Sequence, residues 1–390
     1  MKRHRILVVD DSAAMRALLR LAIQSDPDLE VIGVAPNGRI ALDKLSQLQP
    51  DALTLDVEMP VLDGLQTLRE LRSTHPQLPV VMCSTLTERG SRVTIEALLA
   101  GANDYVAKPS TPQGGREELR QTLVPRLRAL LGLAPDRVQA TAPAPALPVQ
   151  NSTLGRLQAG ASSSTAQDTS TLPRPQDLRL LVIGVSTGGP AALARLVPQL
   201  SSNLRVPVAI VQHMPPLFTR TLAERLDGLG PLRVSEAEGG EELRPGQALI
   251  APGGKHLVLE RAVDRVRARL TEDPPENSCR PAVDVLFRSA ADVHGSGVLA
   301  VVLTGMGNDG ERGCQCVRAA GGGVLAQDEA SSVVWGMPGA VARAGLAHRI
   351  LGLDELAQEI NALVGAPSNV ESALASEDRV SGAPSRGVHG

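Results

Sequence analysis

Aromatic side chains are the scarcest feature of this sequence of 390 residues. Phe, Tyr and Trp together make up only 1% of the chain, with one Trp, one Tyr and two Phe. Platforms of aromatic rings on which nucleic-acid bases stack are therefore not expected. The hydrophobic cores have to be built from Leu, Val, Ile and Ala.

Disulfides, basic surfaces and membrane spans have equally little support. The four cysteines are too few and too scattered for a disulfide framework, and no second pair accompanies Cys314-x-Cys316 to bind zinc. The net charge of −3 provides no general basic field for nucleic acid or for an anionic membrane. No apolar run reaches membrane-spanning length, and the first residues lead into a strand pattern rather than a signal peptide. We therefore expect a cytoplasmic protein without nucleic-acid binding or direct membrane insertion.

Composition divides the chain into four regions. Residues 1–130 and 178–365 alternate apolar strand-like segments with amphipathic segments, which predicts two folded α/β domains. Residues 131–177 are rich in Ala, Pro, Ser, Thr and Gln without an apolar period, which predicts a flexible linker. Residues 366–390 predict a disordered tail.

The first region predicts a parallel sheet, because strands and helices alternate along it and parallel strands need crossover connections. In open sheets of this kind the site lies at the carboxyl ends of the strands. Five strands are expected, at residues 5–9, 31–35, 52–56, 80–84 and 104–107.

Polar residues stand at the ends of four of these strands. Asp10 and Asp11 follow the first, Asp56 ends the third, Ser84 ends the fourth and Lys108 follows the fifth. Three carboxylates that converge on one crevice repel one another unless a cation joins them, and oxygen ligands of this kind favour Mg²⁺. Each residue alone is typical of an ordinary loop. Together they indicate a carboxylate that can accept a phosphoryl group beside two cations.

Through the motifs ILVVDDS, TLDVEMPVLDG and DYVAKP, the first region resembles a response-regulator receiver domain, which has a flavodoxin-like (βα)5 fold. The resemblance implies that Asp56 is phosphorylated by a histidine kinase. It also implies that Mg²⁺ is bound by Asp11, Asp56 and the Glu58 carbonyl, with assistance from Asp10.

The same resemblance implies three switch residues. Ser84 would sense the phosphoryl group, although the adjacent Thr85 leaves this assignment open by one residue. Tyr105 would be the rotameric aromatic of the output face; the alternative is an amphipathic surface residue. Lys108 would complete the switch.

In the second region, the segment LVIGVSTGG ends an apolar strand in a serine surrounded by glycines. Residues 184–188 fit the G-x-S-x-G pattern of a strand-to-helix turn that presents a nucleophilic serine, here Ser186. Pro190 suits the first turn of a following helix, whose free N–H groups would stabilise an oxyanion. A glycine-rich turn that holds a phosphate or simply packs tightly is the alternative.

A serine nucleophile needs a base and an orienting carboxylate. His213 follows the apolar strand at 206–212, and Asp309 lies in a glycine-rich loop after the strand at 298–304, so both are expected at the same sheet edge as Ser186. His256 and His294 are the competing histidines. The competing carboxylates, Asp284 and Asp292, are expected on a helix surface. Further strands are expected at 247–251, 256–260 and 323–327, which favours a second doubly wound parallel α/β domain.

The chain order Ser, His, Asp differs from the Ser, Asp, His order of α/β-hydrolases. The motifs GVSTGG, QHMP, PAVDVLF, LTGMGNDG and VWGMPGA, with the preceding receiver and linker, resemble the chemotaxis protein-glutamate methylesterases of the CheB family. The resemblance implies that Ser186, His213 and Asp309 are catalytic and that the Met306 backbone N–H helps the oxyanion hole. Thr187 and His256 would be secondary site residues.

The family's activity is then expected here: hydrolysis of glutamyl methyl esters on methylated chemoreceptors, and deamidation of specific glutamines. A histidine kinase would activate it by phosphorylation, relieving obstruction of the site by the receiver. Mg²⁺ would serve the receiver, and the hydrolase chemistry would need no cofactor. A catalytically weak receiver-linked adaptor is the alternative. A DNA-binding regulator is disfavoured, because the sequence lacks a basic helix-turn-helix.

Overall fold

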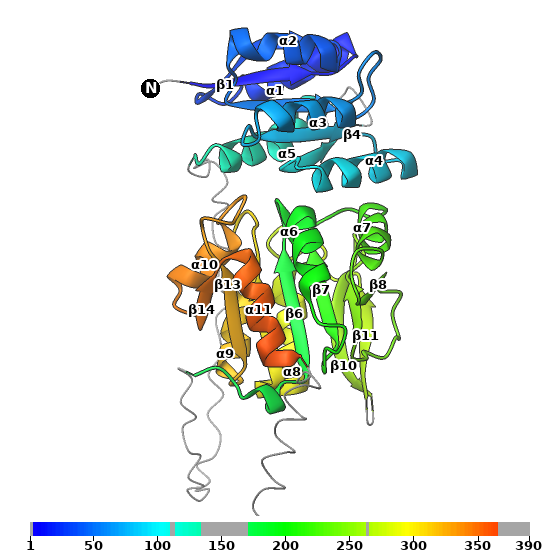
Figure 1. Ribbon diagram of the computed structural model, residues 1–390, viewed down its shortest axis with the longest axis vertical. Coiled ribbons are helices and arrows are strands. Elements are labelled where there is room, and N and C mark those ends of the chain that lie inside the picture. The colour runs from blue at the N-terminus through cyan, green and yellow to red at the C-terminus, as the bar shows by residue number, and fades with distance from the viewer. Residues whose placement is uncertain (1–2, 110–113, 134–170, 263–264, 366–390) are drawn as a thin grey trace, which may run out of the picture. The chain divides into compact units, whose positions relative to one another are not determined.

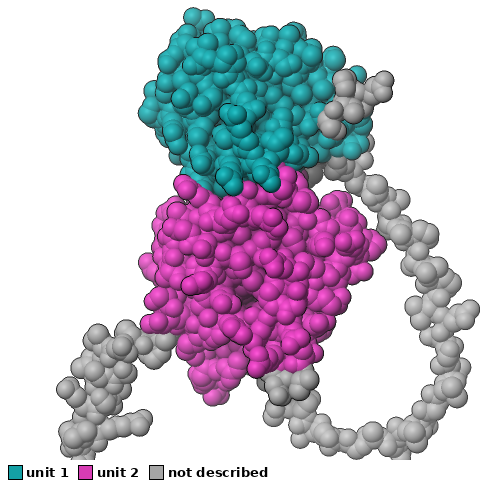
Figure 2. Space-filling model, turned by 90° about the vertical axis from the view of Figure 1, so that its right-hand side faces the viewer, with its two compact units in different colours: residues 1–172 teal, residues 173–390 magenta. Residues whose placement is uncertain are grey.

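The computed structural model describes residues 3–109, 114–133, 171–262 and 265–365. Two compact units, Met1–Leu172 and Pro173–Gly390, are coloured separately in Figure 2. Most of the predicted linker, and the whole predicted tail at 366–390, lie outside the described residues. Among the helices of the described segments, none is long and apolar enough to cross a membrane.

The first unit contains a parallel sheet of five strands in the order β2-β1-β3-β4-β5, which confirms the predicted α/β fold. Its strands are β1 (His4–Val9), β2 (Leu29–Ala35), β3 (Ala52–Asp56), β4 (Val80–Ser84) and β5 (Asp104–Ala107). Its helices are α1 (Ala13–Ile23), α2 (Gly38–Leu48), α3 (Gly64–Thr74), α4 (Glu88–Leu99) and α5 (Gly115–Leu130). Helix α1 contacts α5, and α3 contacts both α2 and α4, so the helices form two layers that cover the sheet (Figure 1).

Short polar residues end the loops of this unit and begin its helices. The side chains of Ser12, Asn37, Asp63 and Thr87 each accept a hydrogen bond from a backbone N–H in the first turn of a helix. Such caps satisfy donors that the helix itself leaves unpaired. The strands β3 and β4 are buried along their whole length, as expected for a sheet with helices on both faces. The chain therefore turns at the carboxyl ends of these strands, where its polar residues gather.

The second unit contains a parallel sheet of seven strands in the order β14-β13-β12-β6-β7-β9-β8, with β10 and β11 as a separate antiparallel pair. The strands are β6 (Leu180–Val185), β7 (Val208–Gln212), β8 (Arg233–Glu236), β9 (Gln247–Ile250), β10 (His256–Ala262), β11 (Arg265–Thr271), β12 (Val298–Val302), β13 (Gly323–Gln327) and β14 (Arg349–Leu351). The α-helices are α6 (Gly189–Leu196), α7 (Phe218–Asp227), α8 (Val283–His294), α9 (Glu311–Ala319), α10 (Met337–Arg343) and α11 (Leu353–Val364).

The doubly wound sheet was predicted, but its edge strands and the separate hairpin were not. The segment predicted as a strand at 256–260 leaves the parallel sheet and pairs with β11 in a hairpin (Figure 1). Strands β8, β11 and β14 escaped prediction, because they lie at edges or outside the sheet and carry exposed arginines in place of an apolar run. Apolar runs identify only strands that are buried on both faces.

Helix α8 links the centre of this sheet to the hairpin. It contacts β6, β10 and α9, and its Phe287 is fully buried. At its first turn, Val283 packs against Gly184 of β6, where a Cβ atom would lie 2.3 Å from the Val283 Cγ1 atom. Gly184 therefore permits the close approach that places the N-terminus of α8 beside the ends of the central strands.

We expect Gly184→Ala to lower the free energy of unfolding of the second unit by about 1–3 kcal/mol, because the added methyl group overpacks the contact with Val283. Denaturant unfolding followed by circular dichroism measures this change. Gly228→Ala is the matched control, since a Cβ there would meet nothing closer than 3.8 Å. It should change stability by no more than about 0.5 kcal/mol. Equal stability of the two variants would contradict the packing argument.

Candidate functional site

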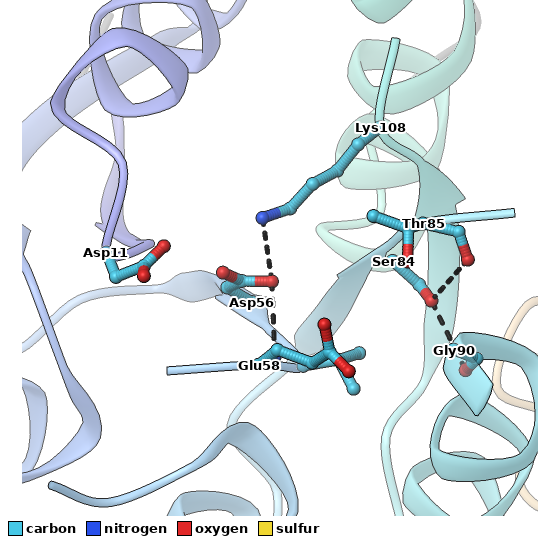
Figure 3. A pocket seen from close by; sticks show the side chains of 8 residues that line it. Asp11, Asp56, Glu58, Ser84, Thr85, Gly90 and Lys108 are labelled. Atoms are coloured by element: carbon cyan, nitrogen blue, oxygen red, sulfur yellow. Dashed lines mark hydrogen bonds and ion pairs between the residues drawn. The ribbon is translucent and has the colours of Figure 1, made fainter. Parts of the chain in front are cut away.

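A pocket of about 220 Å³ lies at the carboxyl ends of β3, β4 and β5 in the first unit (Figure 3). It is lined by Asp11, Asp56, Val57, Glu58, Ser84, Thr85, Gly90 and Lys108. The structure thus brings together nearly all the residues predicted for this site. Asp10 is fully buried next to them, and its Oδ2 atom lies 2.8 Å from the Lys108 Nζ atom.

Lys108 joins two of the carboxylates. Its Nζ atom also lies 2.8 Å from Oδ1 of Asp56, as the dashed line in Figure 3 shows. Asp10, Asp11 and Asp56 each offer an oxygen within 4.8 Å of the others. One ammonium therefore faces three carboxyl groups, and the pocket has an excess of negative charge.

The Asp56 carboxyl is only partly satisfied. Burial raises its pKa to about 6, and the hydrogen bond and charge of Lys108 do not offset this effect. Its buried Oδ2 atom has no hydrogen-bond partner among the described residues. A divalent cation beside this oxygen would supply the missing positive charge, so the donor set fits Mg²⁺. Mg²⁺ binding is typical of the receiver domains that this unit resembles in sequence.

The remaining residues predicted for the receiver are Ser84 with its neighbour Thr85, Glu58 and Tyr105. The Ser84 hydroxyl donates to the carbonyls of Thr85 and Gly90 at 3.2 and 3.3 Å, and both Ser84 and Thr85 line the pocket. The choice between them therefore stays open. The Glu58 N–H points to Asp56 Oδ1 at 3.4 Å. Tyr105 is only 7% exposed, and burial raises the pKa of its phenol, so the alternative of a surface residue is wrong.

In the second unit, Ser186 stands directly after β6. Its N–H donates to the Thr304 carbonyl at 3.0 Å, and its carbonyl accepts from the Gly189 N–H and the Gln212 side chain. Helix α6 begins at Gly189 and has no side-chain cap, but its first N–H already donates to the Ser186 carbonyl, and Pro190 has no N–H. The predicted strand-turn-helix around the serine is confirmed.

His213 and Asp309 form a direct pair. The Nε2 atom of His213 lies 2.7 Å from Oδ2 of Asp309. His213 follows β7 and Asp309 lies in the loop after β12, and these strands flank β6 on its two sides. Three neighbouring strands therefore bring the predicted serine, histidine and aspartate to one edge of the sheet. Among the described residues the Ser186 hydroxyl makes no hydrogen bond, and contacts of this kind often tighten only with substrate bound.

The Asp309 carboxylate is buried, yet both of its oxygens are fully occupied. Oδ2 also accepts the Val283 N–H at 2.7 Å, and Oδ1 accepts the N–H groups of Asp284 and Gly310 at 3.0 Å. Asp309 therefore caps α8, whose own N-cap residue provides no side-chain acceptor. Burial raises the pKa of Asp309, but His213 and these N–H donors outweigh it, so the pKa is lowered and the carboxylate stays ionised.

The charge of Asp309 acts on His213 in turn. Burial lowers the pKa of His213, but the hydrogen bond to Asp309 outweighs it, and the pKa is raised above the ordinary value. The imidazolium form is therefore strongly stabilised in this site. Asp309 occupies Nε2 of His213, and the other ring nitrogen, Nδ1, lies 3.6 Å from the Cys279 sulfur.

One prediction about the competing residues needs correction. Asp284 is not a helix-surface residue: it is 1% exposed, and its Oδ1 atom accepts the N–H groups of Gly310 and Gly313 at 2.9 and 2.7 Å. The helix pattern did not show that a second helix, α9, would begin against it. Asp292 is exposed, as predicted. His294 lies at the end of α8 opposite to the turn that contacts Asp309.

His256 does not join the pair. It is 1% exposed, its Nδ1 atom accepts the Ala282 N–H at 3.2 Å, and its Nε2 atom lies 3.2 Å from the Pro274 carbonyl. Both ring nitrogens are thus engaged with backbone groups next to the start of α8, which favours a supporting role over direct participation.

Met306 and Thr187 lie close to Ser186. A Cβ atom at Gly305 would lie 2.8 Å from the Ser186 Cβ, so the loop that carries Met306 passes directly beside the serine. The Thr187 carbonyl accepts the Thr304 hydroxyl at 2.9 Å, which ties the serine turn to the same loop.

Sequence reasoning missed two residues that touch the pair. The Asn277 side chain donates to Asp309 Oδ1 at 2.8 Å, and the Cys279 sulfur lies 3.6 Å from Nδ1 of His213. They stand in a segment without helix or strand period, and neither has a motif of its own. Only the proximity to PAVDVLF in the sequence could have pointed to them.

A receiver fold with an acidic phosphoacceptor-type pocket, joined to an α/β unit with hydrolase-type residues, defines the class of response regulators with an enzymatic output. Residues 6–120 match the response regulator receiver domain family, and residues 181–360 match the CheB methylesterase family.

Two relatives align with this chain over more than nine-tenths of its length. The protein-glutamate methylesterase/protein-glutamine glutaminase of Nocardioides sp. is 52% identical over 91% of this chain and 94% of its own length. That of Trichodesmium erythraeum is 46% identical over 94% of this chain and 100% of its own. The crystal structure of the Thermotoga maritima CheB methylesterase catalytic domain is 43% identical and covers 48% of this chain and 99% of that one, with a TM-score of 0.47. The chain belongs to the family of response-regulator protein-glutamate methylesterases/protein-glutamine glutaminases.

We expect Asp309→Asn to lower the pKa of His213, because a neutral amide no longer stabilises the imidazolium while burial continues to oppose it. Titration of the ring resonances by NMR measures the change. His294 is the internal control, since its pKa is lowered by burial and by arginines and not influenced by Asp309. An unchanged His213 pKa would contradict the electrostatic account of the pair.

Proposed function

We propose that Ser186, His213 and Asp309 hydrolyse glutamyl γ-methyl esters on methylated chemotaxis receptors and deamidate specific glutamines at such sites. The observation that carries the proposal is the placement of all three residues at one sheet edge by β6, β7 and β12, with His213 and Asp309 2.7 Å apart. The names of the relatives support the same two reactions.

In the first step, the Ser186 hydroxyl attacks the ester carbonyl and His213 takes its proton at Nδ1. Asp309 holds the ring through Nε2 and stabilises the imidazolium that forms. Because Asp309 is fixed by backbone N–H groups of α8, the ring is oriented before the substrate arrives. Preorganisation of this kind avoids the cost of rearrangement during the reaction.

The negative charge that develops on the carbonyl oxygen needs donors close to Ser186. The Met306 backbone N–H is the proposed donor, and the positive end of the α6 dipole favours the same negative charge. His213 then returns the proton to the departing methanol, and water hydrolyses the acyl-enzyme to glutamate. A glutamine passes through the same tetrahedral intermediate and releases ammonia. These steps use only protein side chains and water, and no cofactor is assigned to them.

Regulation is proposed to act through Asp56, with a histidine kinase of the chemotaxis two-component system as phosphodonor. Mg²⁺ would be held by Asp11, Asp56 and the Glu58 carbonyl with assistance from Asp10, and would offset the charge of the phosphoryl oxygens. Lys108 already lies 2.8 Å from Asp56, and Ser84 or Thr85 lies on the side where the phosphoryl group would reach. Tyr105 is proposed to respond on the output face, and the unphosphorylated receiver to obstruct the active site. A cytoplasmic location is part of this proposal.

Ser186→Ala should abolish ester hydrolysis and leave the fold intact, because the substitution removes one oxygen atom from a partly exposed residue. His213→Ala should be nearly as severe, and the double variant little worse, since the members of such a set act as a unit. Release of methanol from methylated receptor fragments measures the activity. Losses that multiply independently, or undiminished activity of Ser186→Ala, would sink the assignment, and absence of hydrolysis by the wild type itself would favour the adaptor alternative.

Asp56→Ala should prevent activation by a small-molecule phosphodonor with Mg²⁺ and leave basal hydrolysis unchanged. Activation should be partial, on the order of tenfold to a few hundredfold, because shifting a closed state from 1% to 99% open needs about 5.5 kcal/mol and a few charge-assisted hydrogen bonds supply only part of it. Hydrolysis rates with and without phosphodonor measure the effect. Equal activation of both proteins would remove Asp56 from the switch.

A further inference from the structure

The turn Glu276–Cys279, between β11 and α8, reaches both members of the His213–Asp309 pair. Cys279 approaches the base, with its sulfur 3.6 Å from Nδ1 of His213. Asn277 approaches the acid and donates to Asp309 at 2.8 Å. No other described side chain touches the His213 ring nitrogen that Asp309 leaves open.

The turn is held firmly in place. Glu276 and Cys279 exchange two backbone hydrogen bonds of 3.1 and 2.8 Å. Arg288 of α8 binds both carboxylate oxygens of Glu276, at 2.7 and 2.6 Å. Asn277 and Ser278 adopt positive φ values of 51° and 62°, a conformation that costs about 1–2 kcal/mol per residue outside glycine. The surrounding contacts have to supply this energy, so the shape of the turn is specified by the fold.

The sulfur occupies a chemically specific position. Nε2 of His213 is taken by Asp309, and the Cys279 sulfur lies 3.6 Å from Nδ1, the atom that accepts the Ser186 proton in the proposed function. A thiol is a weak donor and its sulfur a weak acceptor. It can therefore contact the neutral ring and the imidazolium in turn, without competing strongly with the serine.

We propose that Cys279 is a positioning residue for His213, which holds the ring at Nδ1 while Asp309 holds it at Nε2, and which stabilises the ring when it takes up the proton. The inference rests on the proposed role of His213 as the base. Asp309 and Cys279 are the titratable groups that contact its ring, one at each nitrogen.

Kinetics of the full-length Cys279→Ala variant test this role. We expect kcat to fall about 3- to 10-fold with KM unchanged, the size of one weak hydrogen bond. The acid limb of the kcat/KM profile should move to lower pH, because the sulfur favours the protonated ring. Cys279→Ser should recover most of kcat. Unchanged kcat and pH profile in Cys279→Ala would overturn the proposal, and so would a loss as complete as that of Ser186→Ala, which would make the thiol a nucleophile.

Thiol labelling provides a readout that does not depend on the alanine variant being well packed. Cys83 and Cys314 are buried, whereas Cys279 and Cys316 are partly exposed. N-ethylmaleimide should inactivate the wild type and the matched control Cys316→Ala, and leave Cys279→Ala at its initial activity. Equal inactivation of Cys279→Ala and the wild type would place the sensitive thiol elsewhere and overturn the proposal.

The two hypotheses fail in different ways. Full activity of Ser186→Ala or His213→Ala would remove the proposed function itself. Inactive Ser186→Ala and His213→Ala together with a Cys279→Ala variant that matches the wild type would leave the function intact and remove only Cys279.

Discussion

The sheet edge of the second unit that carries Ser186 and His213 depends on one buried carboxylate. Asp309 is 2% exposed and accepts hydrogen bonds from the His213 ring, the Asn277 amide and three backbone N–H groups. Two of those N–H groups belong to the first turn of α8, where the helix dipole favours negative charge. Removal of the carboxylate would leave the helix uncapped and the histidine without its partner at the same time. The position of helix α8 and the orientation of the His213 ring are therefore set by the same group.

Asp284 binds the start of α9 in the same way as Asp309 binds the start of α8. It belongs to the first turn of α8 and accepts the N–H groups of Gly310 and Gly313 at the start of α9, while Asp309, which directly precedes Gly310, caps α8. Each helix start is thus bound by a carboxylate from the segment of the other. The Asn277 amide donates a hydrogen bond to both carboxylates. Burial raises the pKa of Asp284, and the charge of the nearby Asp309 carboxylate raises it further. The single Asn277 amide therefore relieves a local repulsion.

The buried strands and the polar residues at their ends could be predicted from the sequence. All five strands of the first unit and the central strands of the second were predicted, because they are continuous apolar runs, and their ends identified Asp56, Ser186, His213 and Asp309. The exposed strands β8, β11 and β14 had no such signal. The Glu276–Cys279 turn and the capping role of Asp284 could not be predicted either, since each arises from contact between segments that only folding brings together. His256 was placed near the site by resemblance, but its ring is committed to backbone groups.

The two units use aspartate in opposite ways, and hydrogen bonding decides which. Asp309 is saturated with donors, its pKa is lowered, and neither oxygen is left to react. Asp56 is also buried, but Oδ2 has no partner among the residues described, and the pKa is raised to about 6. A carboxylate with all its lone pairs engaged is suited to hold a histidine, whereas one with an open oxygen beside a lysine is suited to accept a phosphoryl group. Burial alone does not separate these roles, because both side chains are almost completely buried. The number of donors that the fold directs at each carboxylate separates them.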